Sequence, residues 1–597
     1  MFRYIAMVWA ASHPQQAAAA HSLSRNWQQR ADWHAALLQP GLHVFTAGSK
    51  PGINMEHLLP EGFGLILGKL FRRVEFDSTP SPCAVFSDDD AASISRSGGR
   101  ALVDHFWGRY IAFLPSAPGG TAVLRDPSGT LPCFRTCHEG VTVFFSWLDD
   151  LLEMIGPAEK LRVDWEVLMS RVMHGPPNGR HTALAGICQL LPGERFDVGT
   201  GQSSLLWSAV DQARSAADMK TEDATRLLGH AVRSCVRSWA ACYETLLLRL
   251  SGGVDSSILA ACLSPRGTPA DVICVNYHSP GSDSDERHFA MLAAGRAGRD
   301  LITRERDPGF RIERVLQIAR MPNPVPYVGA MNASSDASLA AAHQAGALFA
   351  GTGGDPLFYE LPSWWPAADY LHDKGLDTGF AAAAMDAARL DRVSLWRATR
   401  LAWQERFRPD LAARVQTMKN ALLATELTEK PQDGLRFAHP ALREALDLPI
   451  GKHVQTVALM YPIGYYEPFE QARAPESVHP LFSQPLVELC LRLPSYLLTR
   501  GGQGRALARR AFAAELPTQI VHRRSKGGID DHVKAVLQRN LEFVRALLLD
   551  GELCRRGIID RAKVEEALSG RPTTLPWLPG LVHELVAIEA WASRWKH

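Results

Sequence analysis

The sequence lacks three features that would place it in common classes of protein. Its 64 Lys and Arg residues are balanced by 63 Asp and Glu residues, for a formal net charge of +1, so no global attraction draws it to nucleic acid or to an anionic membrane. No apolar run reaches the roughly 18 residues that a membrane-spanning helix needs. Its ten cysteines include no CxxC pair, the spacing typical of zinc and redox sites. We expect a globular protein that binds no nucleic acid and is not an integral membrane protein.

The cysteines that are present also indicate a cellular location. Several of them, among them Cys235, Cys262 and Cys274, lie within apolar segments. Buried, reduced thiols are typical of cytoplasmic proteins, so we expect a cytoplasmic location. The opening segment MFRYIAMVWAASHPQQ weakly resembles a signal peptide, but the apolar run is short, and a first β-strand is the favoured interpretation.

Two patterns divide the chain, whose 597 residues suffice for several domains. Up to about residue 205, short apolar segments such as GLILGKLF and VTVFFSW alternate with turn residues, a pattern typical of β-strands. From about residue 221, strand-like and helix-like segments alternate, which predicts a mostly parallel sheet covered by helices. We expect a β-rich domain over residues 1–205 and an α/β domain over residues 206–597, helical towards its end, with irregular linkers over residues 201–222 and 427–436.

The segment LLLRLSGGVDSSILAACL, residues 246–263, predicts a strand, a tight turn and a helix that starts at about Ser256. Gly252 and Gly253 let backbone N–H groups approach an anion, and the helix presents its positive N-terminus to the same point. Three serines add hydroxyl donors: Ser251, Ser256 and Ser257. This combination is typical of a phosphate-binding loop, although the GxxxxGK[ST] pattern is absent. A purely structural turn is the less favoured alternative.

Asp255 lies in the same loop, where it would repel a bare phosphate. Its presence makes sense if a cation lies between the two anions. Carboxylate oxygens are ligands that Mg²⁺ prefers, and the ion also bridges to phosphate oxygens. The loop therefore predicts a site for a nucleotide phosphate together with Mg²⁺.

SGGVDSS resembles the pyrophosphate-binding loop of the N-type ATP pyrophosphatases, and further segments make the chain similar to class B asparagine synthetases. ALFAGTGGDPLF, residues 347–358, resembles a strand followed by the G-x-G-[AS]-D turn of that family, and HRRSK, residues 522–526, resembles its R-x-K element. WGRYIAF, RDPSGTLPCF and TALAGICQLLPGE resemble its amidotransferase domain. The resemblance spans nearly the whole chain. It implies an N-terminal glutamine-amidotransferase-like (Ntn) β sandwich followed by an ATP pyrophosphatase domain of the adenine-nucleotide α-hydrolase type.

The resemblance implies ATP and Mg²⁺ as cofactors, with Asp255 and Asp355 as metal ligands and Lys526 stabilising the pyrophosphate and the transition state. The residues implied to contact ATP are Leu250, Ser251, Gly252, Gly253, Asp255, Ser256, Ser257, Val275, Gly351 and Gly353. Tyr359 and Glu360 follow the second loop closely and are candidates for the base that deprotonates an attacking amine.

Other residues near these motifs leave alternatives open. Glu286 is a further candidate base, although a helix-capping carboxylate is the favoured interpretation. Arg524 is a candidate to assist Lys526, and a solvent-exposed basic run is an equally good interpretation of Arg523 and Arg524. Two aromatic-rich segments, residues 323–332 and 360–370, are expected either to line a substrate groove or to pack on themselves as a hydrophobic lid.

Two departures from the resembled family narrow the expected activity. A working glutaminase of that family has a cysteine after the initiator methionine, whose thiolate attacks glutamine; here the residue is Phe2, and no cysteine occurs before Cys83. Pro356 stands where asparagine synthetases usually carry a glutamate, which weakens the case for free aspartate as substrate. We expect an AMP-forming ATP-dependent carbon-nitrogen ligase without glutaminase activity, whose amine belongs to the substrate.

Among the subgroups without the cysteine, the chain is most similar to lasso-peptide cyclases. That resemblance implies adenylation of an Asp or Glu side chain of a leader-processed peptide and closure of a macrolactam by the peptide's N-terminal amine. It also implies a leader peptidase and a leader-recognition protein as partners. The alternatives are a β-lactam synthetase-like or other ligase for a small substrate, and a non-catalytic nucleotide-binding scaffold. A tRNA-thiolating enzyme shares the SGGxDS loop, but neither its cysteine pair nor a basic extension is evident.

Overall fold

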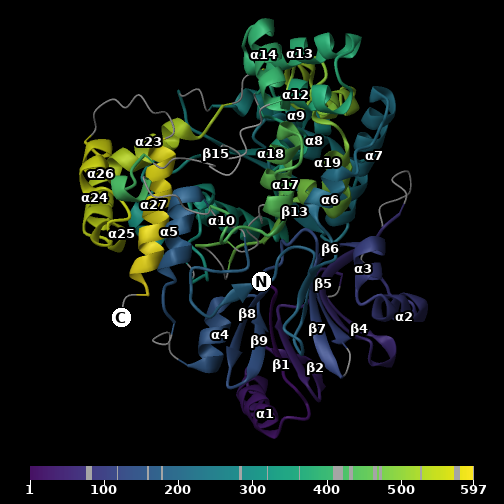
Figure 1. Ribbon diagram of the computed structural model, residues 1–597, viewed down its shortest axis with the longest axis vertical. Coiled ribbons are helices and arrows are strands. Elements are labelled where there is room, and N and C mark those ends of the chain that lie inside the picture. Colours follow the sequence, from purple (N-terminus) through teal and green to yellow (C-terminus); the bar gives the residue numbers. More distant parts are fainter. Residues whose placement is uncertain are drawn as a thin grey trace.

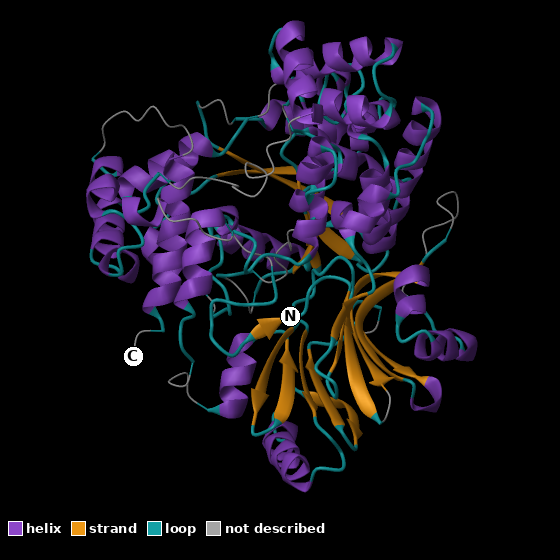
Figure 2. Ribbon diagram, in the orientation of Figure 1, coloured by secondary structure: helices purple, strands orange, loops and turns teal. Residues whose placement is uncertain are grey.

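A computed structural model describes residues 1–50, 52–74, 84–116, 119–156, 161–175, 179–281, 285–318, 320–361, 363–407, 421–428, 434–460, 467–469, 473–524, 527–569 and 578–595. Two antiparallel sheets form the N-terminal part, at the bottom of Figure 1, and a parallel sheet with many helices forms the rest. Figure 2 shows the same contrast, with strands gathered below and helices above. The fold is therefore mixed α/β, which confirms the predicted class. Within the described ranges, no helix is both long and apolar enough to span a bilayer.

The N-terminal strands form two six-stranded antiparallel sheets. The first has the order β10-β8-β9-β1-β3-β2, with β1 (Arg3–Val8), β2 (His34–Gln39), β3 (Leu42–Ala47), β8 (Phe134–His138), β9 (Val141–Phe145) and β10 (Cys188–Gln189). The second has the order β12-β11-β7-β6-β5-β4, with β4 (Met55–Leu59), β5 (Gly64–Arg72), β6 (Phe106–Ser116), β7 (Gly120–Arg125), β11 (Glu194–Asp197) and β12 (Ser203–Leu205).

Strand β1 is buried on both of its faces. Tyr4 and Ala6 belong to the apolar core that the two sheets share, whereas Ile5 and Met7 belong to the cluster on the outer side of the first sheet. This alternation follows from the pleat, which points successive side chains to opposite faces. The opening segment therefore forms a strand, as favoured from the sequence. Helices α1 (Pro14–Gln28) and α4 (Leu148–Ile155) contribute to the outer cluster, and α2 (Asp88–Arg96) and α3 (Arg100–His105) cover the second sheet.

The second half is built on a five-stranded parallel sheet. Its order is β15-β14-β13-β16-β17, with β13 (Thr245–Arg249), β14 (Asp271–His278), β15 (Leu301–Glu305), β16 (Ala347–Phe349) and β17 (Glu476–Val478). Leu246 and Leu248 of β13 belong to the same cluster as residues of α7 (Thr221–Ala240), α8 (Val254–Cys262), α9 (Arg287–Ala297) and α19 (Gln484–Arg492). Leu247 faces the other way, towards α10 (Ala333–His343). The apolar run LLL is thus a strand covered on both faces.

Helices make up most of the remaining chain. They are α5 (Trp165–His174), α6 (Ala209–Arg214), α11 (Gly354–Leu357), α12 (Trp365–Asp373), α13 (Thr378–Asp391), α14 (Leu395–Phe407), α16 (Thr425–Thr428), α17 (Ala441–Ala445), α18 (Ile450–Leu459), α20 (Ser495–Leu498), α21 (Ala506–Ala511), α22 (Thr518–Val521), α23 (Asp530–Arg539), α24 (Leu541–Leu549), α25 (Glu552–Arg555), α26 (Arg561–Ala567) and α27 (Leu578–Ser593). Short 3₁₀ helices occur at η1 (Pro60–Gly62), η3 (Ile312–Gln317), η4 (Val328–Ala330) and η5 (Pro480–Phe482). Helices α12, α13 and α14 pack around their own apolar cluster at the top of Figure 1.

The predicted strand and helix around the phosphate loop are confirmed, with α8 beginning at Val254 rather than Ser256. The predicted linker over residues 201–222 is wrong in part, because it contains β12 and α6. Ala209 and Val210 of α6 are buried in the core of the second half, which gives this helix the tertiary packing that a short segment needs. The linker expected over residues 427–436 falls partly outside the described residues.

A buried charge cluster joins the two halves of the chain. Glu476, on the edge strand β17, forms ion pairs with Lys69 of β5 at 3.3 Å and with Arg109 of β6. The Lys69 ammonium also donates to the hydroxyl of Tyr243 at 2.5 Å, and Arg109 donates to the backbone carbonyl of Ser477 at 3.2 Å. Since Lys69 and Arg109 are almost fully buried, these contacts fix the second antiparallel sheet against the edge of the parallel sheet.

Candidate nucleotide-binding and catalytic site

The two glycine loops meet where the strand order of the parallel sheet reverses. The chain runs from β13 to β14 and β15 on one side, and then to β16 on the other side of β13. In sheets of this kind, ligands bind outside the carboxyl ends of the strands at such a switch point. The loop 251–253 follows β13 and the loop 350–353 follows β16, so both lie at this point.

The first loop has the geometry of a phosphate-binding turn. Gly252 has a φ of +78°, and a Cβ on it would lie 2.6 Å from the backbone nitrogen of Ala290 in α9. Only glycine fits both demands. Gly253 is the N-cap residue of α8, and its backbone N–H donates to the hydroxyl of Ser251 at 3.2 Å. The N-terminus of α8 therefore lies beside the loop, where its positive end favours an anion.

The second loop brings its aspartate to the first. A Cβ on Gly351 would lie 3.0 Å from the backbone nitrogen of Ser256, and a Cβ on Gly354 would lie 2.5 Å from Cγ of Asp255. The close approach of the two backbones needs these small residues. As a result, Asp255 and Asp355 lie near enough for one side chain to contact both.

That side chain is Arg505, which directly precedes α21 and is 3% exposed. Its Nε and Nη2 donate to the two oxygens of Asp255 at 2.7 and 2.9 Å. Nη2 also contacts Asp355, and Nη1 forms an ion pair with Glu360 at 2.6 Å. Burial opposes the charge, but Asp255, Glu360 and Asp355 together raise the pKa of Arg505 above its ordinary value. The guanidinium therefore remains a cation between three carboxylates.

Strained backbone conformations are concentrated around this cation. Arg505 has a φ of 56°, Tyr359 has a φ of 64° and Arg392 has a φ of 55°. Among the described residues, five non-glycine residues have positive φ, and Arg392 and Arg505 line the same cavity, as does Glu360, the residue after Tyr359. Residues held in this region of backbone space tend to cluster at functional sites.

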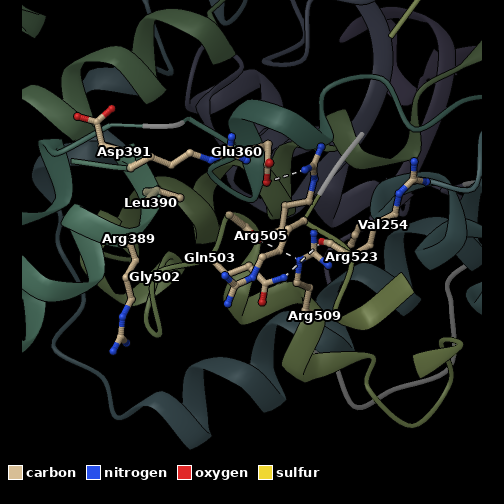
Figure 3. Close-up of a pocket in the computed structure, with 14 residues that line it drawn as sticks. Val254, Glu360, Arg389, Leu390, Asp391, Gly502, Gln503, Arg505, Arg509 and Arg523 are labelled. Carbon is tan, nitrogen blue, oxygen red and sulfur yellow. Dashed lines mark hydrogen bonds and ion pairs between the residues drawn. The ribbon is translucent and has the colours of Figure 1, made fainter. Parts of the chain in front are cut away.

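The cavity beside the glycine loop has a volume of about 680 Å³. It is lined by Gly253, by Glu360 and Asp391, and by six arginines: Arg389, Arg392, Arg505, Arg509, Arg523 and Arg524. Figure 3 shows Arg505, Arg509 and Arg523 on one side of it, and Arg389, Leu390 and Asp391 from the end of α13 on another. Arg505 and Arg523 pair with carboxylates, as does Arg389 with Asp386 at 3.8 Å. The guanidinium groups of Arg392, Arg509 and Arg524 also line the cavity and fit an anionic ligand.

Arg523 and Glu286 pair beneath the first glycine loop. Arg523 forms an ion pair with Glu286 and donates to the carbonyl of Gly252 at 3.3 Å. Glu286 also accepts from the backbone N–H of Gly527 at 2.9 Å and makes no side-chain hydrogen bond to the start of α9. Glu286 is the N-cap residue of α9, as the capping interpretation places it, but its carboxylate is engaged by Arg523 and does not cap the helix. The exposed-run interpretation is wrong for Arg523, whose side chain is 9% exposed.

The other predicted site residues have varied positions. Leu250 and Val275 are buried, the backbone N–H of Leu250 donates to the carbonyl of Val275, and the carbonyl of Leu250 accepts from Asn276 at 2.9 Å, so these groups are engaged within the protein. Glu360 reaches the cavity. Tyr359 is fully buried, and burial and then the nearby Asp369 raise its pKa well above the ordinary value, so its hydroxyl has no access to a substrate amine in this structure. Lys526 lies outside the described residues.

The two aromatic-rich segments pack into apolar cores. Tyr327, in the first, is 1% exposed and donates or accepts a hydrogen bond with His583 of α27. Trp364 and Trp365, in the second, pack against the cluster of α12–α14. Among the described residues of these two segments, Glu360 is the one that lines the cavity. The two segments thus lie in separate apolar clusters, and their described residues form neither a groove lined by both nor a lid in which they pack on themselves.

Sequence reasoning missed Arg505, Arg509 and the end of α13. Arg509 donates to the carbonyls of Gly504, Ile520 and Val521 at 2.8–3.0 Å, and so ties the Arg505 turn to the segment that carries Arg523. The segment RALARRAF gives only one signal, a cluster of arginines in a helix that is otherwise apolar.

The residues of the site fit Mg²⁺ and ATP. A glycine cradle at a helix N-terminus fits phosphate. Asp255 and Asp355 supply the hard oxygen ligands that Mg²⁺ prefers, and the guanidinium of Arg505 shows that they hold a cation between them.

Comparison with known proteins agrees with this geometry. The family model described as asparagine synthase matches residues 223–593, which include both glycine loops and the carboxylates. A search of curated proteins finds no match to the chain. Because the family model covers more than half of the sequence, the chain belongs to the asparagine synthase family, whose members are ATP-dependent ligases.

Proposed function

We propose that the chain is a lasso-peptide cyclase, an ATP-dependent ligase that closes a macrolactam in a leader-processed peptide. A side-chain carboxylate of Asp or Glu attacks the α-phosphorus of ATP, the bond to the β-phosphate breaks, and pyrophosphate leaves. The peptide's N-terminal amine then attacks the acyl carbon, the amide bond forms, one proton is released and AMP leaves. The single observation that carries the proposal is the pairing of the anion-binding glycine loop with Asp255 and Asp355 beside an arginine-lined cavity.

The residues of the chain have separate tasks in this reaction. The N–H groups of the 251–253 loop and of α8 hold the phosphates. Asp255 and Asp355 hold Mg²⁺, which, when bound, neutralises charge on the departing pyrophosphate. Arg523, fixed by Glu286, adds positive charge directly behind Gly252. Glu360 is the candidate base that reaches the cavity, and Lys526 keeps its proposed role at the pyrophosphate.

The N-terminal half supports an amine that comes with the substrate. Phe2 occupies the position expected of a glutaminase nucleophile; it is 2% exposed and packs in the core shared by the two sheets. No cysteine is present in residues 1–82. A phenyl ring has no nucleophile, so we infer that this half releases no ammonia from glutamine.

The shape and charge of the cavity support a peptide with an acidic side chain. Its far wall comes from the end of α13, where Arg389 and Arg392 face it. Arg389 also pairs with Asp386 at 3.8 Å, and the guanidinium of Arg392 would suit a substrate carboxylate. A leader peptidase and a leader-recognition protein of the same pathway would supply such a substrate in the cytoplasm.

The test is a reaction of the purified protein with ATP, Mg²⁺ and candidate core peptides that carry an acidic residue within reach of the N-terminus. We expect one AMP and one pyrophosphate for each product, and a product lighter than the linear peptide by one water. Acetylation of the N-terminal amine should block cyclisation while adenylation of the carboxylate continues. AMP formation with small amino-acid derivatives but with no peptide would refute the peptide substrate, and absence of nucleotide turnover with every substrate would refute the ligase.

A further inference from the structure

One guanidinium occupies the space between the carboxylates that the family uses for a metal. Arg505 contacts both oxygens of Asp255, one oxygen of Asp355 and one oxygen of Glu360. We propose that Arg505 is a positioning residue that holds these carboxylates before the nucleotide binds and releases the two aspartates when MgATP enters. The inference rests on the proposed binding of MgATP at this site, and it adds an order of events: the metal enters only together with the nucleotide.

The hydrogen bonds of Arg505 leave the aspartates poorly placed for a bare metal ion. Both oxygens of Asp255 accept from the guanidinium, at 2.7 and 2.9 Å. Within the part of the chain that the structure describes, no group of three or more His, Cys, Asp or Glu side chains is arranged to hold a metal ion. The guanidinium therefore holds Asp255 and Asp355 near each other, but its own atoms occupy the space between them.

Electrostatics explains why the metal needs the nucleotide. A divalent cation at Asp255 and Asp355 would lie within a few ångströms of a guanidinium that is 4% exposed, where water screens little of the repulsion. The guanidinium cannot lose its proton to relieve this repulsion. The phosphates of ATP bring negative charge with the metal, and they offer Arg505 a new anionic partner. Bare Mg²⁺ brings no such compensation.

Arg505 keeps a partner throughout this exchange. Its Nη1 pairs with Glu360 at 2.6 Å, and Glu360 lines the cavity together with Arg505 itself. Release of the aspartates therefore leaves the guanidinium beside the phosphates rather than in solvent. When pyrophosphate and the metal leave, the two aspartates again need a cation, and the return of Arg505 favours product release.

The test measures metal binding in the absence of nucleotide and peptide. MnCl₂ alone is titrated into the full-length wild-type protein, Arg505→Gln and Arg510→Gln, and free Mn²⁺ is followed by electron paramagnetic resonance. Arg510 is a matched control, because it lies in α21, the helix that Arg505 precedes, and its side chain donates to the carbonyl of Arg500 at 3.0 Å. We expect the wild type and the control to bind weakly, and Arg505→Gln to bind about tenfold tighter or more, since removal of the cation leaves carboxylates uncompensated.

A thermal unfolding series gives a second reading. Arg505→Gln should have a lower melting temperature than the wild type in metal-free buffer, and Mn²⁺ should raise the melting temperature of that variant and leave the other two unchanged. The double variant Arg505→Gln with Asp355→Asn should lose the gain in Mn²⁺ affinity, which identifies the carboxylates as the ligands.

Equal Mn²⁺ affinity of Arg505→Gln and the wild type would overturn the proposal. If the glutamine variant does not fold, Arg505→Met replaces it, because methionine has an unbranched side chain and removes the charge that repels the metal ion. Its affinity for Mn²⁺ should lie above that of the wild type, and an unchanged affinity would again overturn the proposal. These readings need no catalysis, so they stand apart from failure of the cyclase assay.

Discussion

The backbone N–H of Arg505 donates a hydrogen bond of 3.4 Å to the carbonyl of Tyr359, and both residues have left-handed backbone conformations. Each such conformation costs about 1 to 3 kcal/mol for a side chain other than glycine. Two strained residues that face each other place Glu360 and the Arg505 guanidinium on the same side of the cavity. The strained backbone therefore lies where Glu360 and the Arg505 guanidinium are held in fixed positions relative to each other.

Substitution of Asp255 and substitution of Asp355 should lower activity to a similar extent, but they should lower stability to different extents. Asp255→Asn and Asp355→Asn should each lower AMP formation by about 100-fold or more, because each removes a charge that we propose holds the metal. The side chain of Asp255 is 10% exposed and that of Asp355 is 50% exposed. We therefore expect Asp255→Asn to lower the free energy of unfolding by about 2 to 4 kcal/mol and Asp355→Asn by less than about 1 kcal/mol. Urea unfolding checks the difference, and equal losses of stability would contradict it.

Substitution of Gly354 should damage the site without unfolding the protein. A Cβ there would lie 2.5 Å from Cγ of Asp255, so Gly354→Ala must displace that carboxylate. We expect a loss of about 100-fold in AMP formation. Gly295 in α9 is a matched control, because a Cβ there meets nothing within 4 Å, and Gly295→Ala should stabilise the helix by about 0.5 to 1 kcal/mol. Similar activities for the two alanine variants would show that the Asp255 position is not critical.

Introduction of a thiol at position 2 should not create a glutaminase. Phe2 lies within the sandwich core, so Phe2→Cys buries the thiol and removes most of a large side chain. We expect no ammonia from glutamine and a loss of stability of about 2 to 4 kcal/mol. Cyclisation per folded molecule should be unchanged. Leu58→Cys is the control for a new thiol, because Leu58 is 63% exposed. Ammonia release by Phe2→Cys, measured with a coupled dehydrogenase assay, would refute the inference about this half.

Mild acid should destabilise the protein through buried histidines. Burial, and then the nearby Arg180, lower the pKa of His439 from 6.5 to about 4. Between these values the unfolded chain binds a proton that the folded chain does not, so stability falls as the pH decreases from about 6.5 to about 4. His439→Asn keeps an acceptor for the N–H of Ala441, which His439 Nδ1 now binds at 3.2 Å. Urea unfolding at several pH values should show that the free energy of unfolding falls by about 2 to 3 kcal/mol less in the variant than in the wild type between these pH values. An identical dependence of the free energy of unfolding on pH in the two proteins would contradict the prediction.

Features that depend on residues close together in the chain can be predicted from the sequence. Gly252, Gly253 and Asp255 lie within four residues, and their φ demands and charge predict the phosphate loop without any tertiary information. The strand before the loop was predicted in the same way, because a run of three leucines suits a strand covered on both faces.

The rest of the site depends on contacts across the fold. Arg505 and Asp255 are separated by 250 residues, and no spacing or periodicity relates them. The role of Glu286 was interpreted wrongly for the same reason, since its partner Arg523 comes from a segment 237 residues away. The sequence predicts a linker at residue 209, whereas the structure has the short helix α6, which gains its stability from packing against the second half.

The charge cluster around Glu476 gives the N-terminal half a structural role that does not depend on any catalysis by that half. Strand β17 is the edge of the parallel sheet, and an uncovered edge invites pairing with other chains. Arg109 covers it by donating to the carbonyl of Ser477, and Lys69 and Arg109 neutralise Glu476. A synthetase half produced alone would expose both the edge and the carboxylate, and so would be prone to aggregate. The N-terminal half therefore shields the edge of the parallel sheet.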